Sequence, residues 1–292
     1  MRYAFLALAL IGVTALGGCS QGVLDPHGPI ASAERQILFN SLAIMLAIVI
    51  PTIAATLGVA WWFRSSNTRA TYLPDFEYSG RLELLVWSIP AMTVLLVGGV
   101  AWVGAHDLDP RKPISPTVKP LAVQVVSLDW KWLFIYPEQG IASVNHLTVP
   151  VGTPVSFELT SSSVMNSFFV PQLGSQIYTM SGMVTRLQLQ ADHPGSYPGL
   201  SANFSGEGFA DMGFKVNAVP AAQFAQWVTA ARNSGPALDA TSYADLAKPS
   251  RALAPFTYRS VASGLFQQIL SSPLPTSVPS AQRGATSQRA EQ

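Results

Sequence analysis

The chain has 292 residues, a formal net charge of +1, an apolar fraction of 49% and a charged fraction of only 11%. In soluble globular proteins about a quarter of the residues are charged. Part of this chain is therefore expected to be solvated by lipid rather than by water. The small net charge gives no sign of the basic surplus that nucleic-acid binding requires.

The N-terminus has the features of a bacterial lipoprotein precursor. Arg2 is followed by an almost unbroken apolar stretch that ends at Leu16, and two glycines then precede Cys19. The stretch is too short for a membrane span and has the usual length of a signal-peptide core. We predict a signal peptide over residues 1–18 and a lipidated periplasmic segment over residues 19–36. Because Cys19 is the only cysteine, the mature chain would have no free thiol.

Two uncharged apolar stretches follow, over residues 37–63 and 84–105. The first would form a helix of about 40 Å, enough to cross a bilayer with some tilt. Trp87 and Trp102 lie near the two ends of the second, where tryptophan side chains sit at lipid headgroups. These stretches predict two transmembrane helices, joined by a loop over residues 64–83.

The basic residues around the two stretches do not orient them, because the connecting loop and the segment after the second stretch carry similar numbers. The predicted lipid on Cys19 orients them instead, because a lipidated N-terminus lies outside the cytoplasm. The loop would therefore be cytoplasmic, and the linker over residues 106–120 and everything after it periplasmic.

From residue 121 the hydrophobic pattern changes from helical to alternating. Val155, Phe157 and Leu159 alternate with polar residues, and residues 183–190 do the same, which is typical of half-buried strands. Prolines and glycines separate such segments at short intervals. Residues 121–219 are therefore expected to form a β-sandwich or Greek-key barrel.

The pattern becomes helical again over residues 220–270. Apolar residues from Phe224 to Ala231 follow the spacing i, i+3, i+4, i+7, and further short helices are predicted at residues 243–247 and 258–270. Residues 271–292 are mostly serine, proline, threonine, glutamine and alanine. This composition predicts a disordered tail.

Three sequence motifs now carry a resemblance. They are VVSLDWKWLFIYPEQG at residues 125–140, VMNSFFVPQLGSQIY at residues 164–178 and YPGLSANFSG at residues 197–206. Together with the order of the parts, they resemble subunit II of the haem-copper terminal oxidases. The resemblance implies a membrane-anchored α+β fold: a two-helix transmembrane hairpin, then a periplasmic cupredoxin-like Greek-key β-sandwich and short C-terminal helices.

The family divides by its electron donor, and the metal positions indicate the branch. In the cytochrome c oxidases, this domain binds two copper ions through two histidines, two cysteines, a methionine and a backbone carbonyl. Soft thiolates and imidazoles suit copper. The matching positions here are Asn166, Ser201, Asn203, Ser205, Phe209 and Met212. Only Met212 keeps a ligand type, so the resemblance implies a domain that has lost its copper centre.

A domain without copper implies the quinol oxidases of the cytochrome bo type. Such a complex oxidises ubiquinol, reduces dioxygen to water and pumps protons in the bacterial inner membrane. Two haems and one copper would lie in a partner subunit I. This chain would bind no cofactor, would cap subunit I beside smaller membrane subunits, and would have no cytochrome c partner.

The resemblance also implies a role for Glu83 at the mouth of the second span, where a glutamate would begin a proton channel. The alternative is an interfacial carboxylate paired with Arg81. Trp130 and Trp132 correspond to an electron-transfer region of the copper-bearing relatives; without copper, the interpretation as core or interface aromatics is favoured. For the whole chain, the alternative is a free-standing membrane lipoprotein with a copper-less binding or assembly module.

Overall fold

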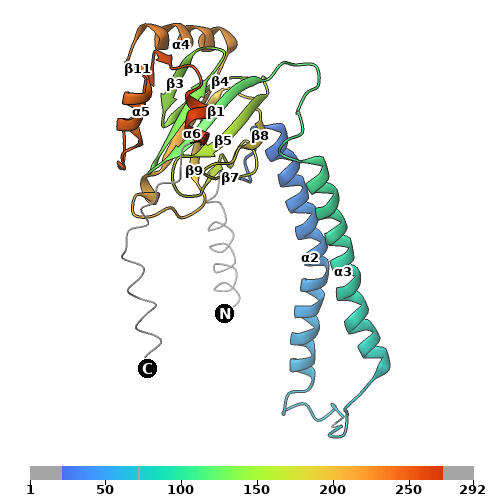
Figure 1. Ribbon diagram of the computed structural model, residues 1–292. Coiled ribbons are helices and arrows are strands. Elements are labelled where there is room, and N and C mark those ends of the chain that lie inside the picture. The colour runs from blue at the N-terminus through green and yellow to red at the C-terminus, as the bar shows by residue number, and fades with distance from the viewer. Residues whose placement is uncertain (1–21, 72, 272–292) are drawn as a thin grey trace, which may run out of the picture. The chain divides into compact units, whose positions relative to one another are not determined.

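The computed structural model describes residues 22–71 and 73–271. The predicted signal peptide, Cys19 and the predicted tail beyond Ser271 lie outside the described residues. The chain divides into two compact units, one over residues 33–109 and one in which residues up to 32 join those from 110 onward. Each unit is described by itself below (Figure 1).

The first unit is a pair of long helices, α2 (Pro29–Trp62) and α3 (Gly80–Asp107). Both are long and apolar enough to cross a membrane. Helix α2 begins at Pro29, before the uncharged stretch, and proline is well suited to a first helical position because its missing N–H needs no partner there. Most of the side chains of the pair are exposed. The apolar surface of the hairpin is therefore left for lipid or protein to cover.

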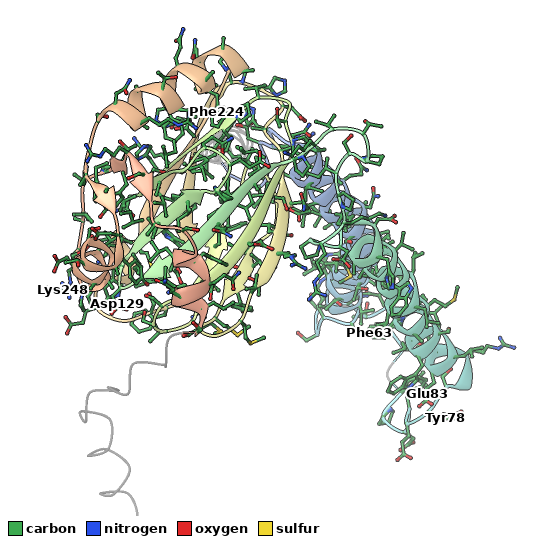
Figure 2. All side chains as sticks on the ribbon, turned by 45° about the horizontal axis from the view of Figure 1, so that its top comes forward. Phe63, Tyr78, Glu83, Asp129, Phe224 and Lys248 are labelled. Carbon is green, nitrogen blue, oxygen red and sulfur yellow. The ribbon has the colours of Figure 1, made fainter. Side chains whose placement is uncertain are left out.

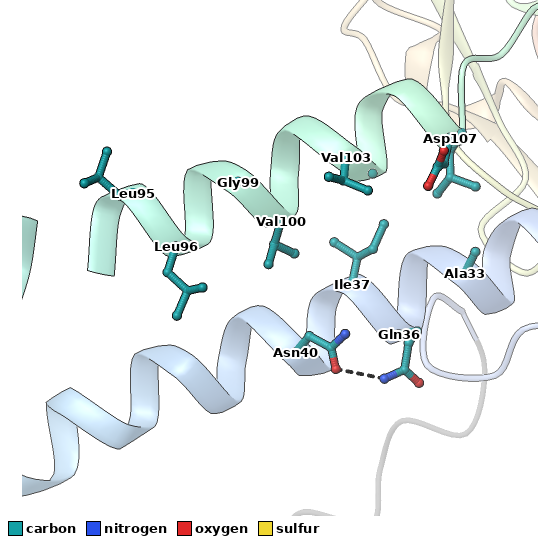
Figure 3. Close-up of a pocket in the computed structure, with 12 residues that line it drawn as sticks. Ala33, Gln36, Ile37, Asn40, Leu95, Leu96, Gly99, Val100, Val103 and Asp107 are labelled. Atoms are coloured by element: carbon teal, nitrogen blue, oxygen red, sulfur yellow. Dashed lines mark hydrogen bonds between the residues drawn. The ribbon is translucent and has the colours of Figure 1, made fainter. Parts of the chain in front are cut away.

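The two helices approach closely at Gly104, where a Cβ atom would lie 2.6 Å from Cδ1 of Ile37. Small residues allow such close approach between membrane helices. Beside this contact lies an open groove of about 660 Å³, shown in Figure 3, whose lining includes Val100 and Val103. Its polar side includes the hydrogen bond from Gln36 Nε2 to Asn40 Oδ1, at 2.8 Å.

The second unit contains a six-stranded and a five-stranded sheet within the described residues. The six-stranded sheet has the order β12 (Phe256–Tyr258), β3 (Ile141–Val144), β2 (Lys131–Tyr136), β1 (Leu121–Leu128), β5 (Val155–Ser161), β8 (Thr185–Leu189). The five-stranded sheet has the order β4 (His146–Pro150), β10 (Gly213–Val219), β9 (Gly195–Ser201), β6 (Asn166–Phe169), β7 (Ile177–Thr179). Within these two sheets, two pairs are parallel, β1 with β5 and β4 with β10.

Aromatic side chains fill the core between the sheets. The ring of Phe168 stacks on that of Phe214 at 5.0 Å between centroids, and Trp132 meets Phe168 at 5.4 Å. Phe134 and Phe157 complete the group. Aromatic residues bury large areas and favour such edge and offset contacts, so this cluster is the main source of stability of the sandwich.

A second core lies on the outer face of β1, β2 and β3, under the C-terminal elements. These elements are β11 (Ala237–Leu238), α5 (Ala240–Ala247), β13 (Ser260–Val261) and α6 (Leu265–Ser271). The buried Val228 and Ala231 of α4 (Ala221–Asn233) belong instead to the core between the sheets. Figure 1 shows α4 across one end of the domain. Leu265, Phe266 and Ile269 of α6 are buried against the sheet. As a result, every residue of β2 is buried.

One predicted helix begins later than the sequence pattern indicates. The sequence pattern predicted a helix over residues 258–270, but Phe256–Tyr258 forms β12 on the edge of β3, and α6 begins only at Leu265. Pairing with an open sheet edge provides these residues with backbone partners that the local pattern does not reveal. Gly264, at a φ of +74°, separates the strands from the helix.

The segment before α2 is part of the second unit. The backbone N–H of His27 donates to the carbonyl of Gln172 at 2.7 Å, and that of Ala31 donates to Leu173 at 3.3 Å. A side chain at Gly28 would collide with the carbonyl of Gln190, so glycine is required for the close approach. Residues 27–31 of the segment predicted to be periplasmic are therefore packed on the β-domain.

Candidate functional site

The six positions that match copper ligands, five of them changed and Met212 retained, lie in two segments of the chain. Asn166 begins β6, and Ser201 ends β9, the neighbouring strand in the same sheet. The other four lie between β9 and β10, in a stretch that includes a 3-10 helix, Phe209–Asp211. We call residues 201–212 the ligand loop.

Three of the six positions form one hydrogen-bonded group. The hydroxyl of Ser201 donates to Oδ1 of Asn166 or to the carbonyl of Asn203, both at 3.2 Å. The amide of Asn203 donates to the carbonyl of Met165 at 3.1 Å. Asn166 and Ser201 are 1% and 4% exposed. Burial of these polar groups is tolerable because they satisfy one another.

The other three positions pack rather than form a polar network. The thioether of Met212 is buried and lies 3.9 Å from the hydroxyl of Ser205. The carbonyl of Met212 accepts a hydrogen bond from Nε1 of Trp132 at 3.2 Å. The half-buried ring of Phe209 packs on that of Phe204 at 5.6 Å between centroids.

This donor set does not fit a copper centre. Copper sites of this kind need thiolate and imidazole ligands, whereas the loop offers neutral amides and hydroxyls, a phenyl ring and one thioether. The amides and hydroxyls are also engaged with one another. Across residues 22–71 and 73–271, histidine, cysteine, aspartate and glutamate side chains form no group of three or more that could hold a metal ion.

The two tryptophans of the first motif have different places. Trp132 is fully buried in the core between the sheets. Trp130 is partly buried, and its indole N–H donates to the carbonyl of Ser205 at 3.1 Å. The expected core role therefore describes Trp132, while Trp130 contacts the ligand loop directly.

Glu83 lies in the first turn of α3, with Phe63 and Tyr78 near the same end of the hairpin in Figure 2. Its backbone N–H bonds to the carbonyl of Ser79 at 2.9 Å, and its side chain is exposed. A carboxylate at a helix N-terminus is favoured by the helix dipole. Within the described residues, the salt bridge to Arg81 that the sequence suggested is not formed.

Sequence reasoning missed an exposed apolar patch around the ligand loop. Its members are at least 40% exposed and lie on strand ends and turns: Val164, Met165, Tyr178, Met183, Leu200 and Phe204. The patch adjoins the site, since the amide of Asn203 bonds to the carbonyl of Met165. The available signal was the large apolar side chains of the second and third motifs, which lie outside the predicted alternating strands.

Comparisons with known proteins place these features in a family. The family model of the cytochrome c oxidase subunit II periplasmic domain matches residues 137–219, and that of the COX aromatic-rich motif matches residues 232–272. The chain is 46% identical to cytochrome bo(3) ubiquinol oxidase subunit 2 of Pseudomonas aeruginosa over 92% of its length and 80% of the relative. It is 48% identical to ubiquinol oxidase subunit 2 of Acetobacter aceti over 87% of its length and 83% of the relative.

The chain belongs to the ubiquinol oxidase subunit 2 family. The resemblance and the fold class inferred from the sequence are thereby confirmed, and the chain is part of an oxidoreductase complex. Its two apolar helices and periplasmic-type domain fit an inner-membrane subunit. A solved structure, the periplasmic domain of cytochrome oxidase subunit II (CoxB) of Bradyrhizobium japonicum, is 24% identical, covering 41% of this chain and 98% of that one; the TM-score of 0.39 is too low to support an argument.

Proposed function

We propose that this chain is the scaffold subunit of a proton-pumping ubiquinol oxidase and binds no redox centre of its own. The observation that carries the proposal is the donor set at the six matching positions, which does not suit copper because it contains no thiolate and no imidazole. Two haems and one copper would reside in subunit I, where quinol would deliver its electrons. Cytochrome c would not be a partner, because this chain would have no metal to accept an electron from it.

The work left to this chain is structural. The hydrogen bonds between Asn166, Ser201 and Asn203 keep the end of the sandwich in a defined shape. Around them, the exposed apolar patch of the domain would be covered by subunit I. The two apolar helices would pack among the membrane helices of subunit I and the smaller subunits.

Purification through a tag on the full chain tests the proposal. We expect a large haem protein to co-purify and the preparation to consume oxygen when ubiquinol is added. Isolation of this chain alone would instead favour the free-standing lipoprotein. The isolated full chain in detergent, dialysed against copper, should retain far less than one ion per chain, and stoichiometric retention would refute the metal-free assignment.

We further propose that the N-terminus is processed at Cys19, that the cysteine carries lipid, and that the C-terminal domain is periplasmic. The support is the sequence of the first 19 residues. Mass spectrometry of the mature protein should show the loss of residues 1–18 and a lipid mass on Cys19. An unmodified chain that begins with Met1 would contradict this.

We also propose that Glu83 takes up protons from the cytoplasm for the reaction in subunit I. Its exposed carboxylate at the start of α3 supports the proposal. In the purified complex, Glu83→Ala should lower quinol-dependent turnover about tenfold, less than the 10²–10⁴-fold of a direct acid–base residue because water can carry protons in parallel. Glu83→Asp should restore much of the rate.

The matched control is Glu77→Ala, which removes an exposed carboxylate from the same connecting loop. It should leave both turnover and proton uptake unchanged. The proposal for Glu83 fails if Glu83→Ala behaves in the same way as this control.

A further inference from the structure

The turn between β1 and β2 holds its tryptophan in an unusual backbone conformation. Trp130 has a φ of +63°, a left-handed value that a bulky residue rarely adopts. Its ring faces the ligand loop. The indole donates to the carbonyl of Ser205, a Cβ atom at Gly206 would be in van der Waals contact with the ring, and one at Gly208 would collide with it. A strained conformation of this kind persists only where its surroundings enforce it.

The next residue connects the same turn to the C-terminal segment. Lys131 is 1% exposed, and its ammonium donates to the carbonyls of Asp129 and Lys248 and to the hydroxyl of Ser250, at 3.2, 2.7 and 2.7 Å. Figure 2 shows Asp129 and Lys248 side by side. Burial lowers the pKa of Lys131, partly offset by the nearby Asp129 charge. The three oxygens are the partners that make burial of this amine possible.

Arg251 contacts both the turn that holds Trp130 and the ligand loop. The guanidinium of Arg251 lies 5.6 Å from the ring centroid of Trp130, within the range of a cation–π contact, and forms a 2.5 Å ion pair with Glu207 of the ligand loop. A further bond, from the amide of Asn145 to the carbonyl of Leu253, fixes the end of the same segment at 2.8 Å. Residues 248–253 therefore contact the ligand loop both directly and through the turn.

Apart from these contacts, the ligand loop is bonded to the rest of the domain near its two ends. The N–H of Ala202 donates to the carbonyl of Ser167 at 2.9 Å, the amide of Asn203 to that of Met165 at 3.1 Å, and the indole of Trp132 to that of Met212 at 3.2 Å. Residues 202–208 belong to no strand of the described structure, and Phe204 and Glu207 are highly exposed. Segments with few buried contacts and no sheet bonds open readily. A metal ion bound by residues on both sides of such a loop would normally supply the missing constraint.

We propose that residues 248–253 act as an internal clamp that fixes the ligand loop, and with it the exposed Phe204 and Leu200, in place of a metal ion. Trp130 and Arg251 are the positioning residues, and Lys131 anchors the clamp to the domain. The inference rests on the proposed metal-free function. It assigns to part of the aromatic-rich motif a role in shaping the end of the domain that carries the ligand loop.

Hydrogen–deuterium exchange of the full chain in detergent tests the clamp. Arg251→Gln should make the hydrogen-bonded amides of the ligand loop, those of Ala202, Phe209 and Asp211, exchange about fivefold faster, since a cation–π contact and an ion pair are lost together. The core strand β2 should keep its protection. Gly208→Ala should give the same local effect without a change of charge, because the new methyl group displaces the Trp130 ring.

The matched control is Arg186→Gln, which breaks another exposed pair, with Glu158 at 3.2 Å between β5 and β8. It should leave the exchange of the bonded amides of Ala202, Phe209 and Asp211 unchanged. The clamp is refuted if Arg251→Gln and Gly208→Ala both leave the loop as protected as in the unmodified chain. Copper analysis of the same samples distinguishes failure of the clamp from failure of the proposed function. Bound copper in the unmodified chain refutes the metal-free function. A metal-free chain whose loop stays protected in both variants refutes only the clamp.

Discussion

The membrane hairpin and the β-domain are both rich in apolar residues, but they bury them in opposite ways. In the hairpin, Trp87, Met92 and Leu95 are 70% or more exposed. In the β-domain, Trp132, Phe134 and Leu133 are fully buried. The difference shows that the domain provides its own apolar interior, whereas the hairpin requires a lipid or protein surrounding.

The largest expected difference between the two regions concerns tryptophan. Trp132→Ala removes a side chain that contacts Phe168 and bonds to Met212, and should destabilise the domain by about 3–5 kcal/mol. Trp102→Ala removes an equally large side chain that is 70% exposed, and should leave the domain unchanged. Thermal unfolding followed by near-ultraviolet circular dichroism measures both. Equal shifts of the midpoint would mean that the two regions are not independent.

A smaller effect is expected at a buried hydroxyl. The phenol of Tyr136 donates to the carbonyl of Thr148 at 3.0 Å and accepts from its N–H at 2.9 Å. Tyr136→Phe should therefore cost about 1–3 kcal/mol, because both backbone groups lose their partner in the core.

The buried phenol also makes the stability of the unmodified domain depend on pH. Burial raises the pKa of Tyr136 far above its ordinary value of 10.0, so its contribution is complete below pH 10 and is lost as the pH rises past 10, when only the unfolded chain ionises. Denaturant titrations at pH 8 and at pH 11 should show a smaller loss for Tyr136→Phe than for the unmodified domain. An identical loss would place the phenol in contact with water.

The smallest effect compares two serines. Ser201→Ala removes the hydroxyl that bonds Asn166 and should cost about 1 kcal/mol, since a buried amide oxygen loses a partner. Ser88→Ala removes a hydroxyl that bonds to the carbonyl of Leu84 within exposed helix α3, and should be close to neutral for the domain. Urea unfolding midpoints distinguish them, and a neutral Ser201→Ala would argue against the hydrogen-bonded group as a stabilising element.

The sequence was most informative where structure depends on near neighbours. Uncharged stretches indicated α2 and α3, and alternation indicated β5 and β8, because these patterns repeat within a few residues. The sequence pattern did not predict β12 or the burial of Lys131, because the partners of these residues are distant in the chain. Phe256 pairs with Val144, and Lys131 bonds to a residue 117 positions further on.

The candidate site shows the same division. Residue types alone indicated that copper would not fit the six positions, and the motifs located those positions through the resemblance. The bond between Asn166 and Ser201 joins residues 35 positions apart, and only the folded sheet brings them together. The left-handed conformation of Trp130 could not be predicted, since tryptophan has no preference for it.

The pairing of β12 with β3 has a consequence for biosynthesis. Strand β3 has its outer neighbour only when residues 256–258 are present, and α6 covers the outer face of the sheet only when residues 265–271 are present. Contacts between such distant segments form slowly, and the uncovered face is exposed to aggregation meanwhile. If the domain is exported from its N-terminal side, the second core closes only after residues 256–271 have been exported, so the outer face of the sheet stays uncovered until then.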